Sequence, residues 1–329
     1  MDPISRGFFL GSAGAAGGDT PETVMSIDEW TGNETARSIT NGIDLAGEGG
    51  IIITHRASSS ADRHIFYTAS GMGVGKYLEM NKVTAAITDT DTVTAFNSNG
   101  FSLGVDTGNV INGNGHDYAA ITIRKMEGFM DVVEYSGNAT NRVISHSLNA
   151  VPEMMIIKNK GPFTENWAVY HKAFGNTHVG KLIDNDAPSS DSAVWNNTTP
   201  TSSVFSVGTD DLTNRSGQSY IAILFASLDG FCKVGSYTGS SSPVNVDCSD
   251  FFSGAPRIVL IKGVDIGGDW MFIYELNSGN DKYFIVNGTG SSDTNDDDID
   301  PHANGFTINR TGSSDWNSNT RDFSFIAIK

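Results

Sequence analysis

Apolar residues along this chain follow two patterns. In "WAVYHK" (167–172) and "FTINR" (306–310) large apolar side chains alternate with smaller or polar ones at a period of two, as in a strand with one buried face. In "MMIIK" (154–158) and "IVLIK" (258–262) the apolar run is continuous, as expected of strands buried on both faces. Turn-forming clusters such as "NGNG" (112–115) separate these runs. The pattern predicts many short strands in antiparallel sheets and almost no helix.

The continuous run recurs along the chain at a fixed spacing. "VPEMMIIK" (151–158) and "APRIVLIK" (255–262) lie 104 residues apart, and one further step back is "GEGGIIIT" (47–54). Other landmarks follow in the same order, and each unit closes on a similar strand: "YAAITIR" (118–124), "YIAILFA" (220–226) and "FSFIAIK" (323–329). A period near 104 residues is too long for a propeller blade and has the size of an independent domain.

We therefore predict an all-β protein of three consecutive antiparallel β-sandwich or jelly-roll-like repeats. The predicted repeats are residues 27–125, 126–227 and 228–329. A Gly/Ala-rich arm, residues 1–26, precedes them. Its short apolar patch is interrupted by glycines and flanked by Asp2 and Arg6, so we expect an unstructured or docked arm that orders on assembly, not a signal peptide.

Net charge, hydropathy and cysteine content indicate which partners and environments to expect. The formal net charge is −17 and the pI about 4.6, which disfavours nucleic-acid partners and anionic membranes. No apolar run is long enough to cross a bilayer, so we expect no membrane insertion. The two cysteines, Cys232 and Cys248, are expected to be reduced and apolar in role.

The sequence predicts no catalytic residue and no bound cofactor, so the protein is expected not to be an enzyme. "GMGVGK" (71–76) has Ser70 where a phosphate-binding loop needs its first glycine. The chain has no G-x-S-x-G elbow and no HExxH pair. His64 aligns with Trp167 and Trp270 of the later repeats, so we expect it to cover the core or the rim as an aromatic side chain.

Two groups of carboxylates could serve catalysis or metal binding. Asp89 and Asp91 would face the same side of a strand, and a carboxylate pair can serve a glycosidase, but exposed polar decoration is the favoured interpretation. The acidic run "SSDTNDDDID" (291–300), from Asp293 to Asp300, could supply oxygen ligands for calcium. It lacks the EF-hand glycine, so a solvated loop is favoured and no metal site is predicted.

Two tryptophans are the candidate ligand-binding residues. Trp195 and Trp316 lie in polar stretches, "VWNN" and "DWNS", at similar late places in the second and third repeats. Exposed in loops, they could bind saccharide by stacking. The alternative is that they cap the rim of each sandwich.

The motifs together resemble a known repeat family. "GNETARSITNGIDLAGEGG" (32–50), "VISHSLNAVPEMMIIK" (143–158) and "KVGSYTG" (233–239) are similar to the first, second and third units of a family in virion proteins of marine tailed bacteriophages. The similarity covers nearly the whole chain. Departures occur in "IIITHRASS" (51–59), which lacks the tryptophan usual in that strand, and in "SSSPVNVDCSD" (240–250), which replaces glycine turns.

The resemblance implies a structural protein of the phage virion, and we expect it on the tail as a fibre-like or receptor-binding component for host adhesion. The alternative is an architectural capsid-decoration, head-surface or tail-assembly protein without receptor binding. Expected partners are other virion proteins through the N-terminal arm, further copies of the chain, with a trimer favoured, and a host-surface glycan or protein. The expected location is the mature particle, after assembly in the host cytoplasm.

Overall fold

The computed structural model describes residues 18–69, 71–292 and 297–329. Within them the fold is all-β, as predicted, and is built from antiparallel sheets. Three helical turns of four residues interrupt the strands: α1 (Pro21–Val24), α2 (Ser192–Trp195) and α3 (Asp211–Asn214). No helix in the described part of the chain could span a membrane.

Residues 25–125, here called unit 1, form one large and one small sheet. The large sheet has the order β1-β9-β3-β4-β5-β6 and the small sheet has the order β2-β8-β7. The strands are β1 (Met25–Thr31), β2 (Arg37–Thr40), β3 (Gly50–Arg56), β4 (His64–Tyr67), β5 (Lys76–Glu79), β6 (Ile87–Thr88), β7 (Val93–Asn97), β8 (Gly100–Leu103) and β9 (Asp117–Arg124).

Residues 126–227, unit 2, have the corresponding strand order, with a large sheet β10-β17-β12-β13-β14-β15 and a small sheet β11-β16. The strands are β10 (Met130–Ser136), β11 (Arg142–Ser145), β12 (Met154–Asn159), β13 (Ala168–His171), β14 (His178–Lys181), β15 (Ser189–Ser190), β16 (Val204–Val207) and β17 (Ser219–Phe225).

Residues 228–329, unit 3, have a large sheet β18-β25-β20-β21-β22 and a small sheet β19-β24-β23. The strands are β18 (Cys232–Thr238), β19 (Val244–Asp247), β20 (Ile258–Gly263), β21 (Met271–Glu275), β22 (Lys282–Ile285), β23 (Ile299–His302), β24 (Gly305–Ile308) and β25 (Asp322–Ile328). In every unit the first strand pairs with the last, and the last pairs with the long central strand. Three copies of one domain would give this correspondence; the repeat boundaries stay a prediction.

Each unit is a sandwich with its own apolar interior. In unit 1 the large sheet contributes Ile52 and Phe66, and the small sheet contributes Phe101 and Leu103, to one buried cluster. Units 2 and 3 have equivalent clusters between their two sheets. Cys248 lies inside the unit 3 cluster, and Cys232 is also buried; both are free thiols.

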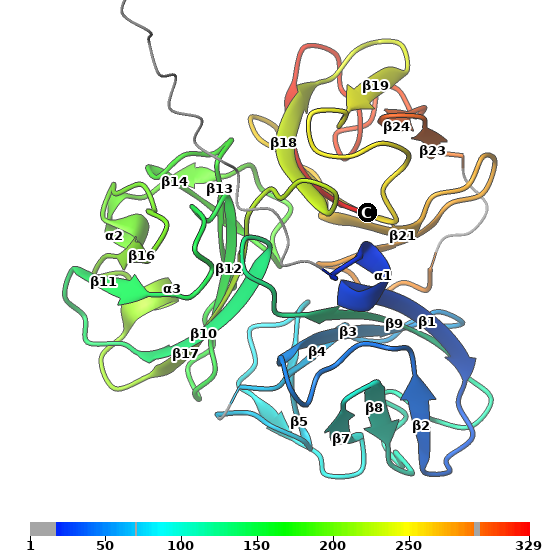
Figure 1. Cartoon of the computed structure of the whole chain (residues 1–329). Helices are drawn as coiled ribbons and strands as arrows, with labels where there is room; N and C mark the ends of the chain where they lie inside the picture. Colours follow the sequence, from blue (N-terminus) through cyan, green and yellow to red (C-terminus); the bar gives the residue numbers. More distant parts are fainter. Residues whose placement is uncertain (1–17, 70, 293–296) are drawn as a thin grey trace, which may run out of the picture.

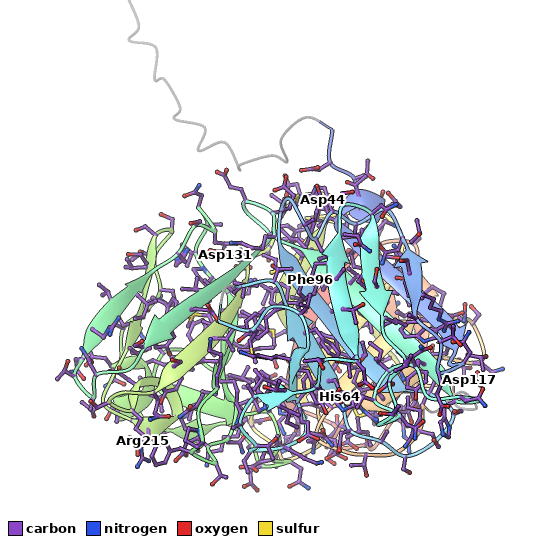
Figure 2. The ribbon with its side chains drawn as sticks, turned by 90° about the horizontal axis from the view of Figure 1, so that it is seen from below. Asp44, His64, Phe96, Asp117, Asp131 and Arg215 are labelled. Carbon is purple, nitrogen blue, oxygen red and sulfur yellow. The ribbon has the colours of Figure 1, made fainter. Side chains whose placement is uncertain are left out.

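The other faces of the three large sheets meet in a central core. Figure 1 shows the units arranged around this centre, with unit 1 in blue and cyan, unit 2 in green and unit 3 in yellow to red. Ile53, Ile156 and Leu260 occupy the same register position in their sheets and belong to one buried cluster. A cavity of about 40 Å³ lies among these side chains. Side chains fill the space between the ribbons of units 1 and 2 (Figure 2).

This arrangement explains the continuous apolar runs. β12 and β20 are buried at every position, because one face of each packs in its own sandwich and the other in the central core. The alternation in "WAVYHK" separates the same two environments: Trp167 and Val169 lie in the central core, Ala168 and Tyr170 in the sandwich of unit 2.

One side chain at the same place in each unit donates a hydrogen bond to a neighbouring unit. Trp167 of unit 2 donates its indole N–H to the carbonyl oxygens of Glu79 and Lys82 of unit 1, each at 3.2 Å. Trp270 of unit 3 donates in the same way to Lys181 of unit 2 at 3.0 Å. Arg63 of unit 1 closes the ring, because its guanidinium donates to the carbonyl oxygen of Gly290 of unit 3.

The strand register corrects the expected position of His64. His64 pairs with Thr54, and the corresponding strand position in unit 2 is Ala168, which pairs with Ile157. The residue in register with Trp167 and Trp270 is therefore Arg63, one position earlier. His64 is buried, but its ring packs edge-on against Tyr77 at 4.9 Å inside unit 1.

The described end of the predicted arm, residues 18–26, is part of the fold. It contains α1 and the first two residues of β1, and Val24 and Met25 are buried in the central core. Residues 1–17 lie outside the described residues, so the arm's expected role in attachment stays a prediction.

Candidate functional site

The prediction that Trp195 and Trp316 are exposed is wrong. Each is only 1% exposed. Trp195 donates its indole N–H to the carbonyl oxygen of His178 at 3.0 Å, and its ring packs edge-on against Tyr170. Trp316 packs in the same way against Tyr283 at 5.3 Å. Both side chains fill the interiors of their sandwiches, so neither has a face free for stacking on a ligand.

The acidic run near the C-terminus is partly described. Asp293 and Asp296 lie outside the described residues. Asp298 is buried and pairs with Arg310 at 2.9 Å, while Asp300 accepts a hydrogen bond from Asn309 at 2.8 Å. These described carboxylates therefore fix their own loop.

Asp89 and Asp91 do lie together, and the fold adds Asp106 to them. One carboxylate oxygen of each lies within 4.8 Å of the others. Burial, followed by the hydrogen bond to Asp91, raises the pKa of Asp89 to about 6. Asp106 accepts hydrogen bonds from the backbone N–H groups of Val110 and Ile111 at 3.0 and 2.6 Å. The cluster thus organises the loop after β8, although its carboxylates are also the ligand type that calcium takes.

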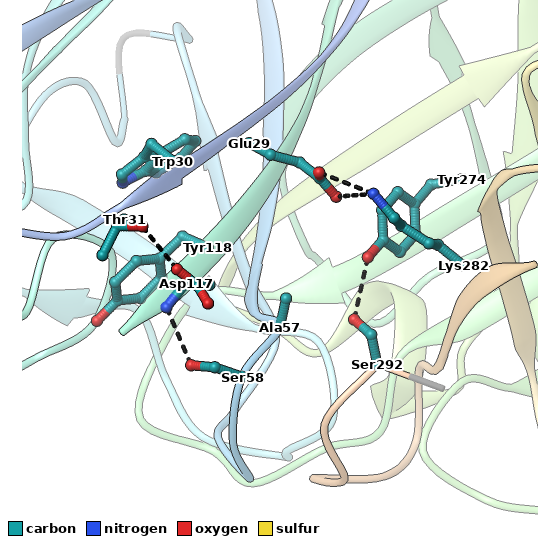
Figure 3. Close-up of a pocket in the computed structure, with 10 residues that line it drawn as sticks. All are labelled: Glu29, Trp30, Thr31, Ala57, Ser58, Asp117, Tyr118, Tyr274, Lys282 and Ser292. Atoms are coloured by element: carbon teal, nitrogen blue, oxygen red, sulfur yellow. Dashed lines mark hydrogen bonds and ion pairs between the residues drawn. The ribbon is translucent and has the colours of Figure 1, made fainter. Parts of the chain in front are cut away.

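The more promising site is a pocket of about 460 Å³ between units 1 and 3, here called pocket A (Figure 3). It combines carboxylates, hydroxyls, one amine and aromatic rings, so several polar groups converge on one hollow, as they do in small-molecule sites. Its lining comes from β1, the ends of β3 and β9, and unit 3: Glu29, Trp30, Thr31, Ala57, Ser58, Asp117, Tyr118, Tyr274, Lys282 and Ser292.

An ion pair joins the two sides of pocket A. Lys282 Nζ lies 2.8 Å from a carboxylate oxygen of Glu29 and 2.8 Å from one of Glu275. Burial acts to lower the pKa of Lys282, but the hydrogen bonds to Glu275 and Glu29 outweigh it and raise the pKa. The Glu29 side chain is 45% exposed, so solvent and ligands can reach it.

A hydroxyl group of unit 3 is held against unit 1. Ser292 Oγ lies 2.6 Å from Nε2 of His55 and 3.0 Å from the hydroxyl of Tyr274. Burial lowers the pKa of His55 well below its usual value, so this imidazole is neutral at physiological pH. Burial also raises the pKa of Tyr274 to about 12. Because His55 is fully buried and Tyr274 is only 1% exposed, Ser292 is the member of this group that presents an uncharged hydroxyl at the pocket wall.

On the opposite side, Thr31 and Asp117 form a polar edge. Thr31 Oγ1 donates to Asp117 Oδ1 at 2.7 Å, and the backbone N–H of Asp117 donates to Ser58 Oγ at 2.9 Å. Figure 2 places Asp117 at the rim of the molecule. Trp30 is half-buried and lies stacked on Tyr118 at 6.0 Å, and its indole N–H donates to the carbonyl oxygen of Ile111 at 3.0 Å. These bonds fix the edge before any ligand arrives.

A second pocket of about 500 Å³, pocket B, adjoins pocket A and shares Glu29 and Tyr274 with it. Ile27 lines pocket B, whereas Trp30 and Thr31 line pocket A, so Glu29 stands between the two along β1. Pocket B adds charged and apolar residues from unit 3: Ala255, Pro256, Arg257, Glu275 and Leu276. The two pockets follow the boundary between units 1 and 3 on either side of one ion pair.

Comparison with known proteins gives a family without an assigned role. The family defined as a domain of unknown function, DUF7483, matches residues 20–329. The chain belongs to the DUF7483 family. No curated protein matches it. For this DUF7483 chain, the function has to be inferred from the residues themselves.

Sequence reasoning missed the residues that build pocket A. Glu29 and Lys282 are 253 residues apart, and no local pattern joins them. A set of buried asparagines was also missed: Asn112, Asn214 and Asn317 hold the loop before the last strand of each unit. Aligning the three units would have found these asparagines, since they recur at the repeat spacing. No such signal was available for the boundary pocket of the DUF7483 chain.

Proposed function

We propose that this protein is a structural component of a tailed-phage particle, associated with the tail, that adheres to the host surface through pocket A. Pocket A carries the proposal, because its charged groups and the hydroxyls of Thr31 and Ser292 are fixed in place and partly exposed. A ligand entering it meets preorganised hydrogen-bonding partners and causes little loss of side-chain freedom. The resemblance to virion proteins is what supports the proposed location on a phage particle.

The framework around the pocket suits a particle exposed to the environment. Three sandwiches share one central core and are cross-linked by the hydrogen bonds of Trp167, Trp270 and Arg63. Sites on strands of such a scaffold are held more precisely than sites on long loops. Adhesion at many copies per particle would add avidity to a weak single contact.

The same framework also favours a second candidate, an architectural capsid-decoration or tail-assembly protein. The apolar faces of the large sheets are satisfied inside one chain. The ring could therefore serve as a rigid spacer that contacts only other virion proteins. In that case pocket A would have no role in contact with the host.

Gold-labelled antibody localisation on intact particles, together with binding of the purified protein to host cells, separates the two. We expect label on the tail and cell binding that falls at least tenfold in the double variant Glu29→Gln/Asp117→Asn. The matched control is Asp322→Asn, since Asp322 accepts from Thr238 in unit 3 as Asp117 does from Thr31 in unit 1, each at 2.7 Å. Label on the head without cell binding would favour the architectural role, and absence of label from the particle would overturn both.

A further inference from the structure

The charge balance of pockets A and B restricts what can occupy them. Pocket A is lined by two carboxylates, Glu29 and Asp117, and one cation, Lys282. Pocket B is lined by Glu29, Glu275 and one cation, Arg257. Both pockets therefore have one more carboxylate than cation, in a chain whose net charge is −17. An acidic ligand would meet repulsion in both.

The cations that line the two pockets, Lys282 and Arg257, already bind groups of the protein itself. Lys282 is shared between Glu29 and Glu275, and Arg257 donates from its guanidinium to the carbonyl oxygen of Met25 at 3.3 Å. Among the described residues, Asp117 has no ion-pair partner within 4.0 Å and accepts only from the hydroxyl of Thr31 among side chains. An incoming ammonium group would find in Asp117 an accessible carboxylate with spare acceptor capacity.

The corresponding boundary between units 1 and 2 shows that this charge pattern is not imposed by the fold. The pocket there, pocket C, has a volume of about 470 Å³ and is lined by Lys76 and Lys160. Ser219 occupies the register position of Asp117, because each is the first residue of the last strand of its unit. No carboxylate is among the residues lining pocket C. Glu134, at the strand position of Glu29, lies beside it and pairs with Lys160, which leaves Lys76 as an excess cation. The acidic character thus belongs to pockets A and B.

We propose that pockets A and B together bind an oligosaccharide that carries amino groups, with one sugar in each pocket and Glu29 between them. This proposal rests on the proposed function, since it names the ligand class of the same site. The amino group of the first sugar pairs with Asp117, and its hydroxyls bond to Thr31, Ser58 and Ser292. The second sugar packs on Ile27, Pro256 and Leu276 and is held by Glu275.

Isothermal titration of the full chain with three tetrasaccharides tests the proposal. The probes are a glucosamine tetramer, an N-acetylglucosamine tetramer and a galacturonate tetramer, at about pH 6 so that the free amines are protonated. We expect the glucosamine tetramer to bind at least tenfold more tightly than the acetylated one, and the galacturonate tetramer not to bind. Asp117→Asn and Glu29→Gln should each weaken glucosamine binding tenfold or more.

The Asp322→Asn variant controls for general attraction of a cationic sugar to an acidic protein. Equal weakening by Asp322→Asn, or preferred binding of the galacturonate tetramer, would overturn the proposal. Thermal melting of each variant verifies that it is folded. Competition on host cells separates this proposal from the proposed function: cell binding that needs Asp117 but is not inhibited by the glucosamine tetramer would retain adhesion and reject the amino sugar.

Discussion

The indole N–H of Trp167 donates to the carbonyl oxygen of Glu79, 88 residues earlier in the chain, and so fastens unit 2 to unit 1. Trp167 is completely buried and also lies with its ring 5.9 Å from the ammonium group of Lys158. Trp270 repeats both features with Lys181 and Lys262. The boundary between two sandwiches is therefore held by a polar contact within an apolar core, where an unpaired carbonyl would be costly.

Trp167→Phe should destabilise the protein by about 1–3 kcal/mol, because it keeps most of the apolar surface but removes the indole donor from the carbonyl oxygens of Glu79 and Lys82. The carbonyl oxygen of Glu79 still accepts from the N–H of Lys82, so most of the cost arises at the carbonyl oxygen of Lys82. Trp270→Phe removes the indole donor from the carbonyl oxygen of Lys181, which still accepts from the N–H of Asp184, and should also be destabilising. Urea denaturation followed by circular dichroism measures both. A Trp167→Phe protein as stable as the parent would show that the indole hydrogen bond contributes nothing.

Asn214→Ala should cost about 3 kcal/mol or more, because Asn214 satisfies three backbone groups at once. Its amide donates to the carbonyl oxygens of Thr140 and Gly208 at 2.7 and 2.5 Å, and its oxygen accepts from the N–H of Asn138 at 2.9 Å. Asn141→Ala, at an exposed position of the same unit, is the control and should change stability little. Equal denaturation midpoints for the two variants would contradict this role.

Acidification should destabilise the protein through its buried histidines. Burial lowers the pKa of His171 to about 4, while an unfolded histidine titrates near 6.5. Between these values the unfolded chain binds a proton that the folded one does not, so stability falls as the pH drops from 6.5 towards 4, by about 3 kcal/mol for this group. In His171→Gln the slope of unfolding free energy against pH over this range should be smaller.

The control for this titration is His302→Gln, which makes the same substitution at a partly exposed position. His64, whose pKa burial also lowers to about 4, continues to contribute in the His171 variant. A slope unaltered by His171→Gln would contradict the assignment.

Asp91→Asn should lower the pKa of Asp89 from about 6 towards its usual range. Burial is the first cause of the raised value, but the hydrogen bond and the charge of Asp91 add to it, and the substitution removes that charge. Because the folded protein holds a proton on Asp89 more tightly than the unfolded chain does, the parent loses this contribution to stability as the pH rises through 6, and the variant should lose less. Carbon-13 NMR titration of the carboxyl groups measures the value directly, and a pKa still near 6 would assign the shift to burial alone.

Much of the fold followed from apolar periodicity, because a strand between two apolar layers has to be apolar at every position. The same reasoning failed for Trp195 and Trp316, since polar neighbours suggested exposure. For Trp195, the turn α2, which begins where Asp191 accepts from the N–H of Ala193, turns the ring into the sandwich. The predicted alignment of His64 with Trp167 and Trp270 was wrong by one residue. It matched aromatic side chains, whereas the strand register puts Arg63 at that position.

Pocket A could not be predicted from the sequence, because its residues come from distant parts of the chain. Pocket A exists only where unit 3 meets unit 1, and its two sides are separated by most of the chain. Asp89 and Asp91 were found as neighbours in sequence, whereas Asp106 joined them only through folding. Local patterns predict strands well, and they carry no information on which surfaces of distant units face each other.

The three units have three boundaries. The peptide chain crosses two of them, and the third, between units 1 and 3, is here called the open joint because noncovalent contacts hold it. Peptide segments link β9 to β10 and β17 to β18, whereas units 1 and 3 are not consecutive in the sequence and meet through contacts such as Lys282 with Glu29 and Ser292 with His55. Pockets A and B lie along this open joint. A ligand that contacts both units across it would stabilise their association by mass action, so occupancy of pockets A and B would be linked to the stability of the closed ring.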